Sequence, residues 1–227
     1  MKGVGNGGPR RGQWLVREIF GSRRSAKVFC VGQNKTGTTS IAEALSELGY
    51  KVGDQPAAEL LIDDWSRRDF RSIVSYCESA DAFQDIPFSL DYTYQALDSG
   101  YPGSRFILTV RDSSDQWYES AVRFHTKMIG KDRIPTAADL KEFAYRRPGW
   151  LWEVMQLVYD DPEDSLYDRD RLMRRYEEYN RRVRDYFRHR PNDLLVLNLS
   201  DPDSMKQLCS FLGKRYDSRV MPHLNRT

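Results

Sequence analysis

Short apolar segments alternate with helical patterns along most of the chain. From Lys27 onward the apolar segments cover residues 27–32, 50–54, 81–85, 105–110 and 193–199. Segments of this length with turn residues at their ends are typical of buried strands. The stretches between them are long enough for the crossover helices that join parallel strands. The pattern therefore predicts an α/β fold with three layers, α/β/α, around a central, mostly parallel sheet of about five strands.

The helical patterns fill the stretches between these strands. In 38–48 the apolar positions repeat at the spacing of one helix face, and Gly49 stands where a helix-terminating glycine belongs. Similar patterns predict helices over 67–79, 89–99 and 114–130. Residues 112–192 are predicted to form a helical insertion before the last strand. Its final helix, about 168–190, has a stripe of Leu172, Tyr176, Tyr179, Val183 and Tyr186 or Phe187.

Composition narrows the class of protein. The chain has 227 residues, of which 40% are hydrophobic, and this excludes global disorder. We therefore expect one α/β domain over 27–227. No apolar run reaches about 18 residues, so no transmembrane segment is predicted. The formal net charge is only +2, which argues against a general affinity for nucleic acid.

The first 26 residues differ from the rest in charge. They carry six basic side chains and one acidic one, and they lack the apolar core of a secretory signal. We expect a basic tail with a short amphipathic helix over 13–22 that packs on the domain. Contact of residues 13–24 with an anionic membrane surface is the alternative interpretation.

Cysteines and histidines give no sign of a metal centre. Cys30, Cys77 and Cys209 lie far apart in apolar stretches, and the three histidines are scattered as well. Neither set has the spacing of zinc ligands, so no metal is predicted. Buried free thiols are typical of a reducing compartment, and we expect a cytoplasmic protein.

One loop carries a strong chemical signal. The strand ending at Gly32 is followed by a short polar loop and by a helix that begins near Thr38. Such a turn presents unpaired backbone N–H groups and the positive end of a helix dipole. Gly37 allows close backbone approach, Lys35 adds positive charge, and the threonines and serine of 38–40 add hydroxyl donors. The segment is predicted to bind an anion such as phosphate.

The loop departs from the Walker A pattern of nucleoside-triphosphatases. That pattern requires lysine directly after its second glycine. Here Thr38 occupies that position, and Lys35 precedes Gly37 by two residues. The order K-x-G-T-T resembles the loop of sulfotransferases that use 3′-phosphoadenosine 5′-phosphosulfate (PAPS). The resemblance implies that the 5′-phosphosulfate is bound by Lys35, Thr36, Gly37, Thr38, Thr39 and Ser40. Ser40 stands where cytosolic members usually have an adenine-contacting tryptophan.

A second motif supports this resemblance, which extends over 27–227. The strand at 105–110 runs directly into Arg111, and Ser120 follows on the next predicted helix. In the family, an arginine and a serine at similar positions bind the 3′-phosphate, although the separation here is nine residues where eight is usual. An ion pair of Arg111 with Asp112 or Asp115 is the alternative. A guanidinium suits the phosphate role because it pairs with phosphate in a fixed fork.

Three candidates exist for the general base that sulfuryl transfer to an alcohol needs. The family's catalytic histidine lies in a T-H-L-P stretch, and Asp85 occupies that position in the Q-D-I-P of this chain. Asp85 follows an apolar run, so partial burial is expected to raise its pKa. Helix capping is its alternative role. His125 is the second candidate, and the pair Asp63 and Asp64 is the third.

The resemblance implies sulfuryl transfer from PAPS, without a metal, to a hydroxyl or amine of a small molecule, lipid or carbohydrate. A kinase or nucleoside-triphosphatase on the same loop architecture is the alternative, and a catalytically degenerate nucleotide-binding module is a third reading. We expect the 112–160 region to shape the acceptor site. Its aromatic residues Trp117, Tyr118, Phe124, Trp150 and Trp152 are expected to be core more often than pocket.

Overall fold

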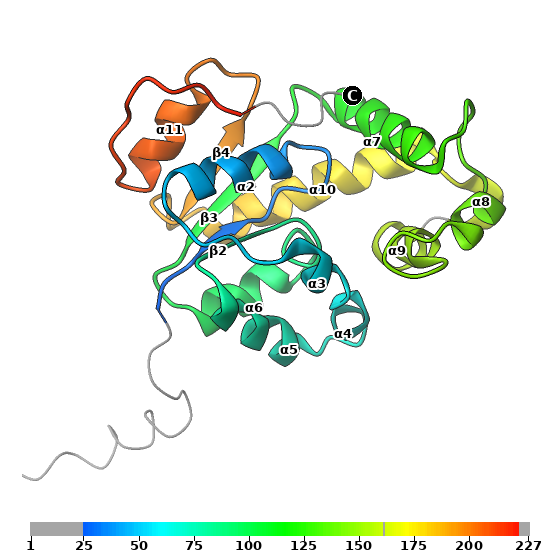
Figure 1. The fold of residues 1–227 in the computed structure, drawn as a ribbon, viewed down its shortest axis with the longest axis horizontal. Coiled ribbons are helices and arrows are strands. Elements are labelled where there is room, and N and C mark those ends of the chain that lie inside the picture. The colour runs from blue at the N-terminus through cyan, green and yellow to red at the C-terminus, as the bar shows by residue number, and fades with distance from the viewer. Residues whose placement is uncertain (1–24, 161, 223–227) are drawn as a thin grey trace, which may run out of the picture.

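The computed structural model describes residues 25–160 and 162–222 (Figure 1). The basic segment 1–24, with its predicted helix and its possible membrane contact, lies outside the described residues. Within the described part, no helix is both long enough and apolar enough to cross a membrane.

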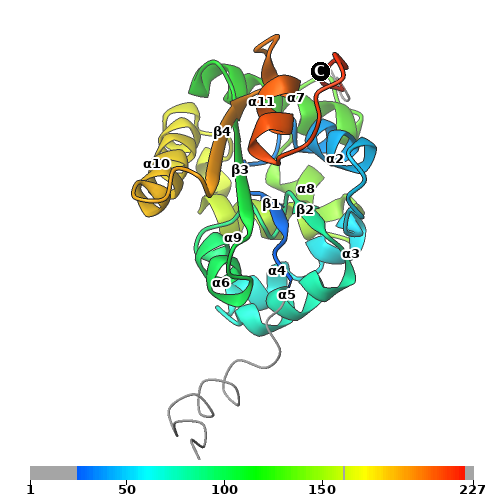
Figure 2. The same ribbon diagram turned by 90° about the vertical axis from the view of Figure 1, so that its left-hand side faces the viewer.

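The centre of the molecule is a four-stranded parallel sheet. Its strands are β1 (Val28–Cys30), β2 (Ala82–Gln84), β3 (Arg105–Val110) and β4 (Leu194–Asn198). They lie in the order β2-β1-β3-β4, which can be followed from right to left across Figure 2. The α/β class and the parallel sheet are thus confirmed, with four strands where about five were predicted. The missing strand is 50–54, of which only Val52 pairs, in an isolated bridge to Ala82.

Helices fill the connections as predicted, although several are shorter than their patterns. They are α2 (Thr38–Glu47), α3 (Gln55–Glu59), α4 (Ile62–Ser66), α5 (Phe70–Tyr76), α6 (Thr93–Gly100), α7 (Ser114–Ile129), α8 (Ala137–Glu142), α9 (Trp150–Tyr159), α10 (Arg169–Phe187) and α11 (Ser204–Phe211). Two 3-10 turns, Cys77–Ser79 and Glu163–Ser165, complete them. The predicted helix at 67–79 is divided between α5 and the first of these turns.

Alternation along the strands divides the core into two. Phe29 and Phe106 point to one face of the sheet and belong to a core cluster with residues of α4, α5, α6, α7, α9 and α10. Cys30 and Ile107 point to the other face and belong to a second cluster with residues of α2 and α11. Successive strand side chains point in opposite directions, so a sheet with two apolar faces must be covered on both. This is the predicted three-layer arrangement.

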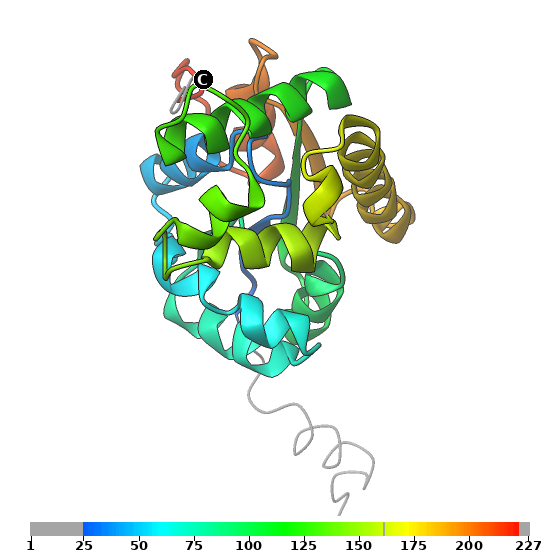
Figure 3. The same cartoon turned by 90° about the vertical axis from the view of Figure 1, so that its right-hand side faces the viewer.

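The insertion before the last strand is helical, as expected, and consists of α7 to α10. The predicted stripe of α10 is buried, including Leu172, Tyr176 and Val183. In Figure 3, α9 lies between α7 and the segment that contains α3 to α5. The insertion therefore reaches the side of the molecule where β1, β2 and β3 end.

Candidate functional site

A cavity of about 200 Å³ lies at the carboxyl ends of β1, β2 and β3. Parallel strands present these ends at one edge of a sheet, where α/β proteins bind ligands. The loop 34–39, the end of β2, Arg111 after β3, and residues of α3, α7 and α9 line it. The predicted site residues that meet here are Lys35, Gly37, Thr38, Thr39, Asp85, Arg111 and His125.

Two glycines shape the anion loop, the segment between Gly32 and Thr38 that the sequence predicts to bind an anion. A β-carbon at Gly32 would lie 1.9 Å from the Oγ1 atom of Thr109, so only glycine lets β1 pass β3 so closely. Gly37 has φ near +100° and precedes α2, and a β-carbon there would meet Leu199 at 2.4 Å. Lys35 also adopts a left-handed conformation, with φ of 65°. The loop thus turns sharply between strand and helix.

The N-terminus of α2 faces the cavity through Thr38 and Thr39. The N-cap residue is Gly37, which has no side chain to accept hydrogen bonds, and no acidic residue lies in the first turn. The first backbone hydrogen bond of the helix is donated by Ile41 to the Gly37 carbonyl, at 3.1 Å. The N–H groups at such a helix start, together with the dipole, attract anions.

Aromatic side chains from the insertion hold the loop in place. The indole Nε1 of Trp117 donates to the Asn34 carbonyl at 3.0 Å, and the Tyr159 hydroxyl donates to Asn34 Oδ1 at 3.0 Å. Tyr179 donates to the Val31 carbonyl at 2.7 Å. Buried aromatic rings with one polar atom suit this use, since the ring packs while the polar atom bonds. The loop conformation therefore depends on α7, α9 and α10.

The aromatic residues of the insertion divide between core and cavity. Trp117 is 1% exposed and belongs to the core, as the sequence favoured, whereas Phe124 and Trp150 line the cavity. Tyr118 also belongs to the core, and Trp152 packs against it. Arg169 lies over the ring of Tyr118, and Lys141 lies over the ring of Trp152.

Two cations lie together in the loop. The Nε atom of Arg111 donates to the Lys35 carbonyl at 2.7 Å, and Lys35 Nζ lies 3.7 Å from the centre of the Phe124 ring. Burial, with the charge of Arg111 adding to it, lowers the pKa of Lys35 to about 8. Burial also lowers the pKa of Arg111. Two desolvated cations at one place cost free energy that an anionic ligand recovers.

The carboxylates near Arg111 in sequence have other partners. Asp112 accepts from Gln116 at 3.0 Å and from Asn198 at 2.5 Å, while Asp115 pairs with Arg169. Among the described residues no carboxylate forms an ion pair with Arg111. The alternative of a purely structural ion pair with Asp112 or Asp115 is therefore wrong.

Asp85 lies next to the anion loop. Its Oδ2 accepts from the Thr38 hydroxyl at 3.0 Å, and its Oδ1 accepts from the Ile86 backbone at 2.9 Å. Burial raises the pKa of Asp85, and these hydrogen bonds and the charge of Lys35 oppose part of that rise. A carboxylate with a raised pKa is a stronger base than an exposed one.

His125 also reaches the cavity, but its environment differs. Its ring is 5% exposed, and Nδ1 lies 2.8 Å from the Tyr167 hydroxyl. Burial, together with Lys35, lowers the pKa of His125 to about 4. The imidazole is therefore neutral at pH 7, and its protonated form is disfavoured.

The third candidate base lies elsewhere. Asp63 pairs with Arg147 at 2.9 Å and Asp64 pairs with Arg67 at 2.6 Å. Neither side chain lines the cavity. Both carboxylates therefore belong to ion pairs of α4 outside the cavity.

Three of the predicted phosphate contacts are not among the cavity residues. Thr36, Ser40 and Ser120 are each 5% exposed or less. The Thr36 hydroxyl donates to the Gln33 carbonyl at 2.5 Å and lies 2.5 Å from Thr109 Oγ1. Its side chain thus stabilises the loop from within. Ser120 precedes the cavity residue Phe124 by one turn of α7.

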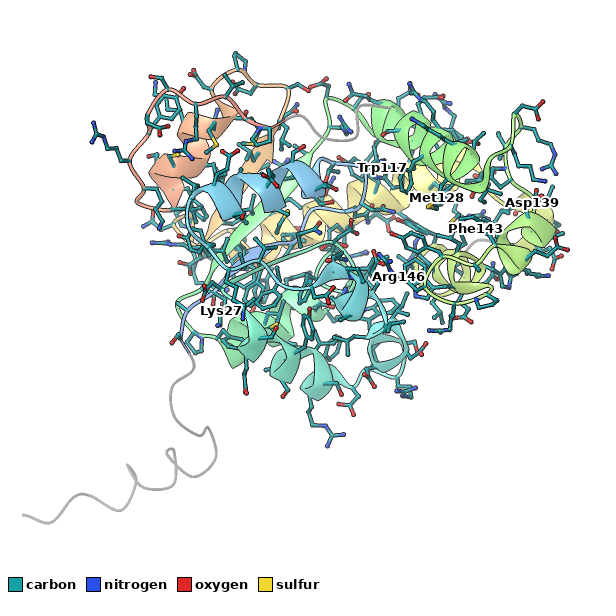
Figure 4. The ribbon with its side chains drawn as sticks, in the orientation of Figure 1. Lys27, Trp117, Met128, Asp139, Phe143 and Arg146 are labelled. Atoms are coloured by element: carbon teal, nitrogen blue, oxygen red, sulfur yellow. The ribbon has the colours of Figure 1, made fainter. Side chains whose placement is uncertain are left out.

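The structure adds cavity residues that the sequence did not indicate. They are Gln55 and Glu59 of α3 and Gln84, whereas Tyr145, Trp150 and their apolar neighbours on α7 and α9 come from the 112–160 region that was expected to shape the acceptor site. Glu59 is 6% exposed, pairs with Arg146, and has its pKa raised by burial. In Figure 4, Arg146 lies between α9 and α3. Only Gln84 had a signal, because it directly precedes Asp85 at the end of a predicted strand.

Within the described ranges, no three His, Cys, Asp or Glu side chains are grouped as metal ligands. Comparison with known families gives one result: residues 27–227 match a family model described as a sulfotransferase domain. No curated protein matches the chain.

Proposed function

Because the chain belongs to the sulfotransferase domain family, we propose that it transfers a sulfuryl group from PAPS to a hydroxyl or amine acceptor. The observation that carries the proposal is the convergence of Lys35, Arg111 and the N-terminus of α2 on one cavity. The acceptor is a small molecule, a lipid or a carbohydrate. A cytoplasmic location is part of the proposal, and it is supported by the three cysteines, which are buried and form no disulfide.

The residues of the loop fit a phosphosulfate group. The backbone of Lys35 and of 37–40 and the hydroxyls of Thr38 and Thr39 would hold its oxygens. Thr36, whose backbone N–H and hydroxyl both donate to the Gln33 carbonyl, would shape the loop from within. Arg111 would bind the 3′-phosphate, because its guanidinium donates from Nε to the Lys35 carbonyl and forms no ion pair with a carboxylate in the described part of the chain. Ser120 would be a second contact to that phosphate. Charge supports this assignment, since the donor is anionic and the two cations beside the loop have lowered pKa values.

The chemistry requires charge stabilisation and a base. The donor supplies a sulfuryl group whose bond to the 5′-phosphate oxygen breaks as the bond to the acceptor oxygen forms. Lys35 lies where it can stabilise negative charge that develops on the leaving phosphate. Asp85 would take the acceptor proton, because it is bonded to Thr38 of the loop and its pKa is raised. His125 is the less suitable base, since its burial penalises the imidazolium that proton transfer would create.

One contact favours the alternative of a kinase or nucleoside-triphosphatase. Thr38 and Asp85 lie 3.0 Å apart, and a hydroxyl beside a carboxylate is a common way to hold Mg²⁺ near phosphates. The position of Lys35 before Gly37 and the family match favour sulfuryl transfer. Magnesium dependence separates the two activities.

The test measures thermal stability and turnover in EDTA. The product 3′-phosphoadenosine 5′-phosphate at 100 times its dissociation constant stabilises a native state by about 2.7 kcal/mol. For a chain of this size that shift is about 5–10 °C in melting temperature. We expect this rise without Mg²⁺, and transfer of labelled sulfate from PAPS. Larger stabilisation by ATP with Mg²⁺ would indicate a kinase, and donor binding without transfer to any acceptor would indicate a degenerate module.

A further inference from the structure

Asp85, the candidate base, has an uncommon backbone conformation. Its φ is 61°, in the left-handed region that residues other than glycine rarely adopt. Such a conformation is costly and persists only where the surrounding contacts hold it. The contacts of the turn that follows Asp85 therefore decide where its carboxylate points.

Hydrogen bonds hold this turn from within and from outside. Within it, the Ile86 N–H donates to Asp85 Oδ1 and the Ser89 N–H donates to the Asp85 carbonyl, both at 2.9 Å. From the anion loop, the Thr38 hydroxyl donates to Asp85 Oδ2 at 3.0 Å. From α3, Gln55 Nε2 donates to the Ile86 carbonyl at 2.9 Å. The bonds of Thr38 and Gln55 thus tie the turn to two other elements.

The segment before α3 brings Gln55 to this place. Val52 forms a parallel bridge with Ala82, and the Gly53 N–H donates to the Ala82 carbonyl at 2.9 Å. Because the two segments run in the same direction, Gln55 follows Val52 by as many residues as Asp85 follows Ala82. Gln55 then begins α3 beside the end of β2. The segment 50–54, which is not a strand, therefore still determines where Gln55 lies.

The amide of Gln55 is held in one orientation. The Ile86 carbonyl can only accept a hydrogen bond, so the amide nitrogen of Gln55 must face it. The same nitrogen donates to Glu59 Oε1 at 3.4 Å, one helical turn further along α3. Glu59 Oε2 is in turn paired with Arg146. A side chain with fixed neighbours is suited to hold a functional group in place.

We propose, resting on the function proposed above, that Gln55 is a positioning residue for the proton transfer to Asp85. Its bond to the Ile86 carbonyl keeps Asp85 in the left-handed conformation in which the carboxylate reaches Thr38 of the anion loop. A general base must lie within hydrogen-bond distance of the acceptor oxygen, and a displacement of about 1 Å can cost about 10²-fold in rate. Loss of the Gln55 bond should therefore slow transfer without weakening donor binding.

The experiment is a double-mutant cycle on the release of labelled sulfate from PAPS to water. Water is the probe acceptor: its oxygen bonds to sulfur as the bond to the 5′-phosphate oxygen breaks, and Asp85 takes its proton. Rates are measured in single turnovers with protein in excess. Gln55→Met keeps the length of the side chain but has no N–H, and we expect release to slow about 10- to 100-fold. Affinity for 3′-phosphoadenosine 5′-phosphate should not change.

The second arm of the cycle separates positioning from a structural role. In the Asp85→Asn variant no base remains to be positioned, so adding Gln55→Met should change the rate by less than about threefold. Gln55→Glu repeats the cycle with a side chain of the same length that cannot donate when ionised. Melting temperatures show whether each variant is folded.

Gln207→Met is the matched control. Gln207 of α11 is partly exposed like Gln55, and its Nε2 donates to Asp201 at 2.8 Å, outside the cavity. The control loses one amide hydrogen bond of the same kind, and it should release sulfate at the wild-type rate.

Each outcome bears on one proposal. An unchanged rate in Gln55→Met, or an equal loss in the wild-type and Asp85→Asn backgrounds, would overturn the positioning role. If the protein binds 3′-phosphoadenosine 5′-phosphate but Asp85→Asn does not slow sulfate release, the role is overturned too, because there is no base to position, while the donor proposal stands. Absence of donor binding would overturn the proposed function itself.

Discussion

Lys35→Met should stabilise the free protein while removing its activity. The environment of Lys35 favours a bound anionic ligand, and without one the buried charge of the lysine destabilises the folded protein. Burial and Arg111 lower its pKa from 10.5 to about 8, a difference that corresponds to about 3 kcal/mol. The side chain is partly exposed and stacks on Phe124, so solvent screening and the lost stacking reduce this value. We expect a net gain of about 1–2 kcal/mol, or roughly 3–6 °C in melting temperature.

The stability gain should depend on pH in a defined direction. Below pH 8 the lysine is charged in both the folded and unfolded chain, and the full cost of burying the charge is present. Between about pH 8 and pH 10.5 the folded chain has lost the proton that the unfolded chain keeps, so wild-type stability rises with pH. The advantage of Lys35→Met should therefore be largest at pH 7 and should shrink toward pH 10.5.

The assay is thermal unfolding at several pH values, with turnover measured in parallel at pH 7. Turnover should fall about 10²–10³-fold, because charge stabilisation of the leaving group is lost. Lys206→Met is the matched control, since Lys206 is an exposed lysine on α11 and its loss should change stability by less than about 0.5 kcal/mol. A lower melting temperature for Lys35→Met at pH 7, or retained turnover, would refute the reasoning.

The remaining predictions concern the other site residues. Arg111→Ala should weaken donor binding at least tenfold, measured by titration of 3′-phosphoadenosine 5′-phosphate, with a smaller effect on kcat. The control Arg123→Ala, on the exposed face of α7, should bind the donor normally. Unchanged affinity in Arg111→Ala would remove Arg111 from the donor site. Asp85→Asn keeps both hydrogen-bonding positions but no basic oxygen, and single-turnover rates should fall about 10²–10⁴-fold with little change in donor affinity. The His125→Asn variant should lose far less, and a larger loss there would transfer the role to His125. In the wild type kcat should rise with pH through the raised pKa of Asp85, whereas His125, with a pKa of about 4, should add no ionisation near pH 6–7. Gly37→Ala should lower the free energy of unfolding by about 1–3 kcal/mol and weaken donor binding, because residue 37 has φ near +100° and the added β-carbon has no room. Normal stability in thermal unfolding would show that the loop can relax.

The sequence was most informative where the signal is local. The loop at 35–40 lies between a strand and a helix that both follow from periodicity, so its place at the end of β1, before the start of a helix, was predictable. Arg111 was predictable for the same reason, because it directly follows a strong strand pattern. The segment 50–54 looked like a strand but is not one. A strand forms only if a neighbour supplies a ladder, and Val52 has a single bridge to Ala82.

The rest of the cavity had a weaker signal. The 112–160 region, with Trp150, was expected to shape the acceptor site, whereas nothing in the segment of Glu59 marked it as part of a site. The aromatic pattern favoured a core position for Trp150, and only the fold shows that this residue both belongs to the core and lines the cavity. The ion pair of Glu59 with Arg146, which joins positions 87 residues apart, likewise depends on tertiary structure.

The sequence by itself determined the layers, the anion loop and the sign of its charge. These follow from side-chain alternation and from residues adjacent along the chain, whose geometry is set by local backbone conformation. The strand order β2-β1-β3-β4 and the placing of α9 beside α3 were decided by tertiary structure. They also set the pKa values of Lys35, Asp85 and His125, because burial and neighbouring charge belong to the folded chain and not to any segment of it.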